Sequence, residues 1–206
     1  MRIALFGGSF DPPHRGHLAV ARAAADAFHL DSVLFAPAGR QPLKLDAAPS
    51  SFADRLAMTA LACAEDERFQ ASSIDAPRPD DLPNYTVDTL AELRRTMPDA
   101  AIFNLVGADS FLDLPRWREP HRLLDLAEWI VVSRPGFSLP DLASDGLAPL
   151  HLTPLQQARV HLLTTVNKDI AATTLRQRLQ AGDPCTDLLP AAVSTYVREH
   201  HLYQPG

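Results

Sequence analysis

Two short apolar runs joined by a helical segment constrain the fold of this chain most. Residues 2–6 (RIALF) form the first run, which stops at Gly7 and Gly8, and residues 32–36 (SVLFA) form the second. Between them, from Gly16 onward, apolar side chains recur on one face at helical spacing. Strand, helix and strand in under 40 residues predict a βαβ unit, and such a unit requires parallel pairing of its strands.

The same alternation of apolar runs and helical patterns continues toward the C-terminus. We expect further strands at residues 69–74, 101–106, 129–133 and 160–166, and further helices at 51–64, 86–98, 173–180 and 190–200, with Pro190 in the first turn. These patterns predict an α/β fold, a doubly wound parallel sheet with a small helical C-terminal end at about residues 170–206. A chain of 206 residues is long enough for one sizeable core, so we expect a single domain over residues 1–206.

Charge and cysteine content argue against several classes of protein. The formal net charge of −6 disfavours a general nucleic-acid binder, although a local cluster of cations can still bind a small anion in a cleft. No run approaches the ~18 apolar residues of a membrane span, and the first apolar run is too short for a signal peptide. Cys63 and Cys185 lack paired spacing, which indicates free thiols in a reducing compartment. We therefore expect a cytoplasmic protein that binds neither nucleic acid nor membrane.

The segment GGSFDPPHRGH, between the first strand and the first helix, has the composition of a phosphate site. Gly7 and Gly8 let a ligand approach the main chain, and the helix beginning near Gly16 offers free amides and a positive dipole end. His14 and His17 lie three residues apart, so both imidazoles can point toward one phosphoryl group. A helix cap with a surface histidine is the alternative reading, whereas a zinc site lacks a third ligand. The segment matches neither the dinucleotide fingerprint nor the P-loop.

Polar residues follow the predicted strands at their carboxyl ends, where open α/β sheets bind ligands. These residues combine glycines, hydroxyls, cations and a carboxylate. They are Gly7, Gly8, Ser9, Lys44, Gly107, Asp109, Ser110, Arg134 and residues 167–169. We therefore expect a nucleotide cleft at this edge of the sheet.

The GGSFDPPHRGH segment closely resembles the signature GG(T/S)FDPxHxGH of the HxGH-motif nucleotidylyltransferases, which are Rossmann-like enzymes. Five further segments resemble bacterial nicotinate-nucleotide adenylyltransferases, in order along the chain. They are PNYTVDTLAELRR (83–95), LVGADSFLDLPRWREP (105–120), VVSRPG (131–136), DIAATTLRQRL (169–179) and VSTYVREHHLY (193–203). The resemblance covers nearly the whole chain. It implies transfer of the adenylyl group of ATP to nicotinate mononucleotide, which gives nicotinate adenine dinucleotide and pyrophosphate.

The resemblance also implies roles for individual residues. His17 would donate a hydrogen bond to the α-phosphate, His14 would contact the same phosphate region, and Arg176 would hold the leaving pyrophosphate. The other residues implied to bind ATP are Gly7, Gly8, Ser9, Lys44, Gly107, Asp109, Arg134 and Thr173. Asp109 would face either ribose hydroxyls or the metal–phosphate group. Tyr85, Thr86 and Trp117 would bind the mononucleotide, with Trp117 stacking on the pyridine ring.

Mg²⁺ is implied as the cofactor that accompanies ATP, held by phosphate oxygens and water, so we assign no metal ligand. Two departures from the family pattern bear on phosphate binding. Ala171 and Ala172 stand where the family motif has serines, and Leu43 stands where the family often has histidine. Nicotinamide mononucleotide or phosphopantetheine as the acceptor, and a non-catalytic nucleotide-binding regulator, are the alternatives that the sequence leaves open.

Overall fold

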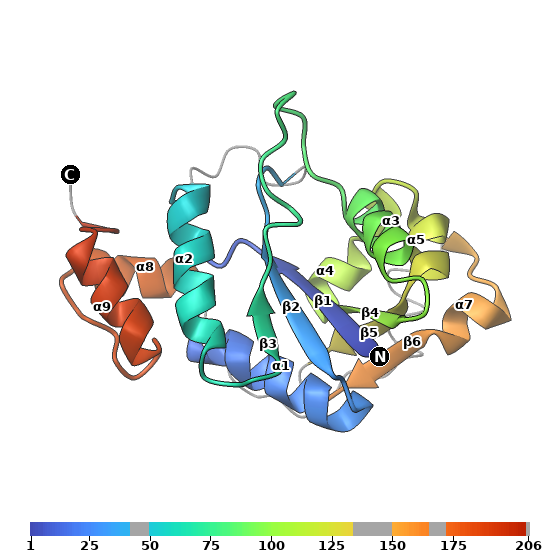
Figure 1. Ribbon diagram of the computed structural model, residues 1–206, viewed down its shortest axis with the longest axis horizontal. Coiled ribbons are helices and arrows are strands. Elements are labelled where there is room, and N and C mark those ends of the chain that lie inside the picture. The colour runs from blue at the N-terminus through green and yellow to red at the C-terminus, as the bar shows by residue number, and fades with distance from the viewer. Residues whose placement is uncertain (42–49, 134–149, 165–171, 205–206) are drawn as a thin grey trace.

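The computed structural model describes residues 1–41, 50–133, 150–164 and 172–204, which include a six-stranded sheet (Figure 1). The strands are β1 (Arg2–Gly8), β2 (Ser32–Pro37), β3 (Phe69–Ala71), β4 (Ala101–Gly107), β5 (Glu128–Val132) and β6 (Val160–Leu163). Every neighbouring pair is parallel, and the order is β3-β2-β1-β4-β5-β6. The order reverses between β1 and β4, which is where such sheets leave a crevice at their carboxyl ends.

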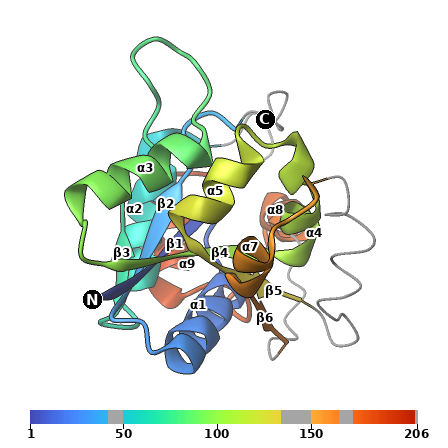
Figure 2. The same ribbon diagram turned by 90° about the vertical axis from the view of Figure 1, so that its right-hand side faces the viewer.

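Helices cover both faces of the sheet, as Figure 2 shows. One face carries α1 (Arg15–Phe28) and α2 (Phe52–Cys63), and its apolar cluster includes residues of α8 (Ala172–Gln180) and α9 (Ala191–Glu199). The opposite face carries α3 (Thr86–Thr96), α4 (Ala108–Leu112), the 3₁₀ turn η1 (Leu114–Arg116) and α5 (Pro120–Leu126). The short helix α7 (Pro154–Ala158) precedes β6.

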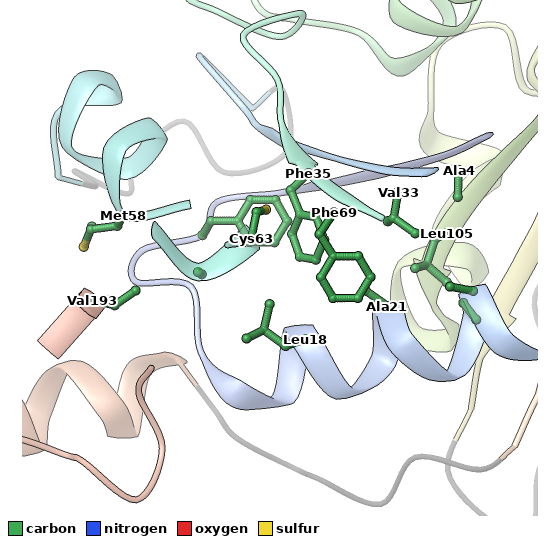
Figure 3. Packing of buried hydrophobic residues seen from close by; sticks show 14 of the residues in the cluster. Ala4, Leu18, Ala21, Val33, Phe35, Met58, Cys63, Phe69, Leu105 and Val193 are labelled. Atoms are coloured by element: carbon green, nitrogen blue, oxygen red, sulfur yellow. The ribbon is translucent and has the colours of Figure 1, made fainter. Parts of the chain in front are cut away.

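The core on the α1 face supports the loop that follows β1. Phe10 lies in this loop with a φ of 47°, yet it is buried, and its ring packs edge-on against Phe6 with 5.5 Å between centroids. Phe35 of β2 contacts Phe10 as well, and Leu18 of α1 points toward Phe35 (Figure 3). A Cβ at Gly8 would meet the Phe10 ring at 3.2 Å. Glycine at this position therefore leaves room for the ring that holds the loop against the core.

The predicted α/β fold, with a doubly wound parallel sheet and helices at the C-terminal end, is confirmed. The predicted strand at 69–74 is wrong in length, because the strand ends at Ala71 and a turn closed by the Ala76 N–H to the Ser73 carbonyl follows. Pro190 is the N-cap of α9, with an extended ψ of 142°, and is not in the first turn. We did not predict the short elements α4, η1, α5 and α7.

Candidate active site

Two histidines cap the N-terminus of α1. His14 is the N-cap residue with an extended backbone, and its Nδ1 accepts a hydrogen bond from the His17 N–H at 3.4 Å. In return, the His14 N–H donates to Nδ1 of His17 at 3.2 Å. The pair is therefore a reciprocal capping box built from imidazoles. The helix cap that we considered as an alternative is present, but His17 also lines a cavity and is not a surface histidine.

The capping hydrogen bonds decide which ring nitrogen carries the proton. Because Nδ1 is an acceptor in both rings, each neutral imidazole carries its proton on Nε2. Burial lowers the pKa of His14 to about 4. Burial, followed in size by the neighbouring His14, lowers the pKa of His17 well below its usual value. Near neutral pH, the pair therefore presents two uncharged Nε2–H donors.

Aromatic packing fixes the orientation of these imidazoles. The two rings stack with 3.7 Å between centroids and 23° between their planes. Phe10 packs edge-on against His17 at 5.0 Å, and Phe6 does so at 6.0 Å. His17 is thus held between the helix cap and the apolar core, so its Nε2–H has a defined direction.

A buried arginine holds together the loops that follow β1 and β2. Arg55 of α2 is 2% exposed, and its guanidinium donates to the carbonyls of Ser9 at 3.0 Å, Ala38 at 2.8 Å and Ser50 at 3.0 Å. Burial lowers the pKa of Arg55, and the nearby Asp11 opposes this shift. The main chain at Ser9 is therefore fixed by a cation from a separate helix.

The C-terminal helices reach the same loop through Asp11. The Asp11 carboxylate is buried and accepts from the Tyr203 hydroxyl and, at 3.1 Å, from the Ser50 N–H. Arg176 of α8 donates to the Asp11 carbonyl at 3.0 Å and to the Thr173 hydroxyl at 3.5 Å. Burial raises the pKa of Tyr203, with Asp11 adding to the shift. Helix α8 therefore places Arg176 against the loop between β1 and α1, which ends at His14.

A cavity of about 450 Å³ opens at the carboxyl ends of β1 and β4. Its wall includes the loop after β1, the start of α3, the central part of β4 and residues 110–118. Trp117 stands in this wall, and its ring packs edge-on against the buried Trp129 at 6.1 Å. Arg118 lies 4.8 Å above the ring of Tyr85. Flat aromatic faces and nearby cations suit a planar, negatively charged ligand.

The cavity brings together several of the predicted site residues from distant parts of the chain. They are Gly7, Gly8, Ser9, His17, Tyr85, Thr86 and Trp117. His14 is held directly against His17. A Cβ at Gly7 or Gly107 would meet no atom within 4 Å, so both positions face open space.

Other predicted site residues do not line this cavity. Asp109 is exposed in the first turn of α4, next to Ser110, which does line it. Arg176 and Thr173 lie on α8 and contact the loop at Asp11 and each other. Lys44 and Arg134, together with Leu43, Ala171 and residues 167–169, lie outside the described residues.

Sequence reasoning missed several polar residues of the cavity wall. They are Gln41, Asp75, Asn84, Asn104, Asp113, Arg116 and Arg118. Burial raises the pKa of Asp75, whose carboxylate accepts a hydrogen bond from Thr89. The one sequence feature that could have pointed to some of these residues was the segment RWR, in which Arg116 and Arg118 flank Trp117.

The described part of the chain contains no group of three or more His, Cys, Asp or Glu side chains arranged to hold a metal ion. The helices of these residues include none with the length and apolar character of a membrane span.

Comparisons with known proteins identify relatives along the whole chain. A family model described as cytidylyltransferase-like matches residues 5–178. A Thermus thermophilus protein named "Probable nicotinate-nucleotide adenylyltransferase" is 42% identical over 204 residues, covering 99% of this chain and 100% of that protein. A protein of the same name from Neisseria meningitidis serogroup B is 41% identical over 203 residues, covering 98% of each.

A solved structure shares the fold. Plasmodium falciparum nicotinic acid mononucleotide adenylyltransferase, complexed with NaAD, superposes with a TM-score of 0.73 and 15% sequence identity. The match covers 98% of this chain and 97% of the other.

The lowered histidine pKa values predict a loss of stability in acid. The unfolded His14 binds a proton near pH 6.5, but the folded one does so only near its pKa of about 4. Stability is therefore lost as the pH falls from about 6.5 toward 4, and His14 accounts for roughly 2 kcal/mol between about pH 7 and about pH 5. His14→Asn keeps a capping side chain without this titration. Urea unfolding of this variant should show an acid loss smaller by that amount.

The matched control for this experiment is His29→Asn. His29 is exposed and has a φ of 49°, which asparagine tolerates, so its substitution should leave the acid loss unchanged. Equal acid losses in the wild type and in His14→Asn would contradict the buried, neutral state of His14.

Proposed function

We propose residue roles for the reaction of the nicotinate-nucleotide adenylyltransferases, the family to which this chain belongs within the cytidylyltransferase-like superfamily. The enzyme transfers the adenylyl group of ATP to nicotinate mononucleotide, which gives nicotinate adenine dinucleotide and pyrophosphate. The observation that carries the proposal is the pair of uncharged Nε2–H donors at the start of α1, with His17 on the cavity wall.

The reaction requires alignment and charge stabilisation more than it requires a base. A phosphate oxygen of the mononucleotide attacks the α-phosphorus of ATP, and the bond from that phosphorus to the bridging oxygen of the β-phosphate breaks. The attacking monoester has its second pKa at about 6, so it is already ionised near neutral pH. The protein therefore holds the reacting groups in line and neutralises the charge that develops on the α-phosphate.

The capped N-terminus of α1 supplies this neutralisation. Nε2–H of His17 donates to the α-phosphate as its negative charge grows, and Nε2–H of His14 donates to the same phosphate region. The positive end of the α1 dipole adds to the field of the two donors. Gly7 faces open space beside them, so a phosphate can approach the main chain there.

Cations and hydroxyls of the later segments bind the leaving pyrophosphate. Arg176 contacts the loop between β1 and α1, and Thr173 lies beside it. Its planar guanidinium suits the β- and γ-phosphates. Because α8 begins at Ala172, amides of its first turn offer donors in place of the motif serines. We also assign ATP contacts to the other residues that the family resemblance implies to bind ATP. These are Gly8, Ser9, Lys44, Gly107, Asp109 and Arg134.

The wall formed by Tyr85, Thr86 and Trp117 binds the nicotinate half of the acceptor. Trp117 offers its face for stacking on the pyridine ring. Thr86 is the first residue of α3, and the N-cap position has no side-chain hydrogen bond, so amides of this helix start face the pyridine carboxylate.

We propose that Mg²⁺ accompanies ATP and is held by phosphate oxygens and water. The described carboxylates do not form a cage for the ion, which is the usual situation for Mg²⁺ at a triphosphate. When bound, the ion lowers the charge repulsion between the triphosphate and the attacking phosphate.

We also propose that residues 1–206 form one catalytic domain in the cytoplasm. Contacts from the C-terminal helices to Asp11 and Asp54 support one unit, and two free, buried cysteines suit a reducing compartment.

Acceptor choice is tested by pyrophosphate release from Mg-ATP. Nicotinate mononucleotide, nicotinamide mononucleotide and phosphopantetheine are supplied separately to the wild-type enzyme, and kcat/KM is measured for each. We expect by far the highest value with nicotinate mononucleotide. A higher value with either other acceptor, or ATP binding without turnover on any of them, would contradict the proposed function.

The role of His17 is tested with His17→Gln. Glutamine at this helix position can still accept the hydrogen bond from the His14 N–H, so the capping box is preserved while the imidazole donor is lost. We expect kcat to fall roughly 100- to 1000-fold with the melting temperature little changed. His121→Gln, on the exposed side of α5, is the matched control. A kcat for His17→Gln within twofold of the control would refute the assigned role.

A further inference from the structure

A buried asparagine lies where the sheet forms part of the cavity at the carboxyl ends of β1 and β4. Asn104 occupies the middle of β4, is 3% exposed and lines the cavity. Its neighbours on the same face of β4, Ile102 and Val106, belong to the apolar cluster of the α3 face. In the register of the sheet, Asn104 lies between Leu5 of β1 and Trp129 of β5. A strand interior of this kind normally carries an apolar side chain.

No hydrogen bond joins the Asn104 carboxamide to another described residue. The carboxamide is not fully enclosed either, because it lines the cavity, and the fully buried side-chain atoms without a partner in the described part of the chain are the hydroxyls of Ser32 and Ser133. The other asparagine of the cavity wall differs in this respect. Asn84 accepts from the Arg40 N–H at 3.0 Å and donates to the Ala76 carbonyl at 2.9 Å, so its carboxamide is engaged in joining two loops. Buried polar groups in folded proteins are normally hydrogen-bonded, and Asn104 lines the cavity, so a ligand in the cavity can supply a partner for its carboxamide.

The chemistry of the cavity identifies this partner. The wall around Asn104 presents Tyr85 and Trp117 as aromatic faces and Val87 as an aliphatic one, which suits a flat heteroaromatic ring. The substituent of such a ring that reaches the sheet must be polar to satisfy a carboxamide. The carboxylate of nicotinate has two acceptor oxygens for this purpose.

We propose that Asn104 determines specificity at the pyridine carboxylate, with its Nδ2–H donating to one carboxylate oxygen from the sheet side of the cavity. The proposal rests on the proposed function, in which Trp117 stacks on the pyridine ring and the start of α3 faces the carboxylate. Asn104 is a substrate-binding residue and takes no part in the chemical step. It therefore affects the acceptor and not ATP.

The proposal predicts different effects of two substitutions on acceptor binding. Leucine has a similar size but neither donates nor accepts, so Asn104→Leu removes the contact for a carboxylate and for a carboxamide alike. Aspartate presents acceptors only, once ionised. Asn104→Asp therefore repels the nicotinate carboxylate while it can accept from the amide group of nicotinamide mononucleotide.

The test is steady-state kinetics with Mg-ATP and either nicotinate or nicotinamide mononucleotide. For Asn104→Leu, we expect kcat/KM for nicotinate mononucleotide to fall roughly 10- to 100-fold, mainly through KM, with KM for ATP unchanged. For Asn104→Asp, the ratio of acid to amide kcat/KM should fall below that of Asn104→Leu. It should fall further as the pH rises from about 6 to about 9 and the new carboxyl ionises.

The matched control is Ser32→Ala. Ser32 is also buried in the sheet, and its hydroxyl has no partner among the described residues, but it lies at the opposite end of its strand from the cavity. Its kinetics should equal those of the wild type. A wild-type kcat/KM in both Asn104 variants, or equal losses for acid and amide with a raised KM for ATP in Asn104→Asp, would overturn the proposal. Failure of the proposed function is distinct, because the wild type would then make no dinucleotide from nicotinate mononucleotide.

Discussion

The reciprocal hydrogen bonds between His14 and His17 are the interaction on which the rest of the site depends. A helix start leaves backbone N–H groups without helical partners. Here the His14 N–H donates to Nδ1 of His17, and the His17 N–H is shared between the His14 carbonyl at 2.9 Å and Nδ1 of His14 at 3.4 Å. This one arrangement caps α1, assigns the ring protons to Nε2 and aims both donors away from the helix. Burial keeps the rings uncharged, so they act as directional donors while the helix dipole supplies the positive field.

Distant parts of the chain converge on the loop that carries this pair. Arg55 fixes the main chain at Ser9 from α2, and Asp11 receives Tyr203 and Arg176 from the C-terminal segment. The proposed phosphate site would move with the loop after β1 if that loop alone formed it. Here its position is determined by two separate helical segments, which gives the preorganisation that electrostatic stabilisation of a transition state requires.

The parts of the structure that follow local rules were predictable from the sequence, and the parts that depend on tertiary contacts were not. The βαβ start follows from apolar runs, and the histidine pair follows from spacing at a helix start. Arg55 lies in an alanine-rich helix, where a lone cation normally indicates a solvated face. Its burial is explained only by three carbonyls from two loops, those after β1 and β2. Asn104 interrupts an apolar strand, and it gains a role only when α3 and residues 110–118 enclose a cavity above it.

The central claim is that both imidazoles are neutral and protonated on Nε2 around neutral pH. Side-chain ¹⁵N NMR of the histidines, assigned with His14→Asn and His17→Gln, measures this directly. The account predicts an unprotonated Nδ1 and a protonated Nε2 for both residues, without titration from about pH 8 down to about pH 5.5. Titration of either ring near pH 6.5, or a proton on Nδ1 of either ring, would contradict it.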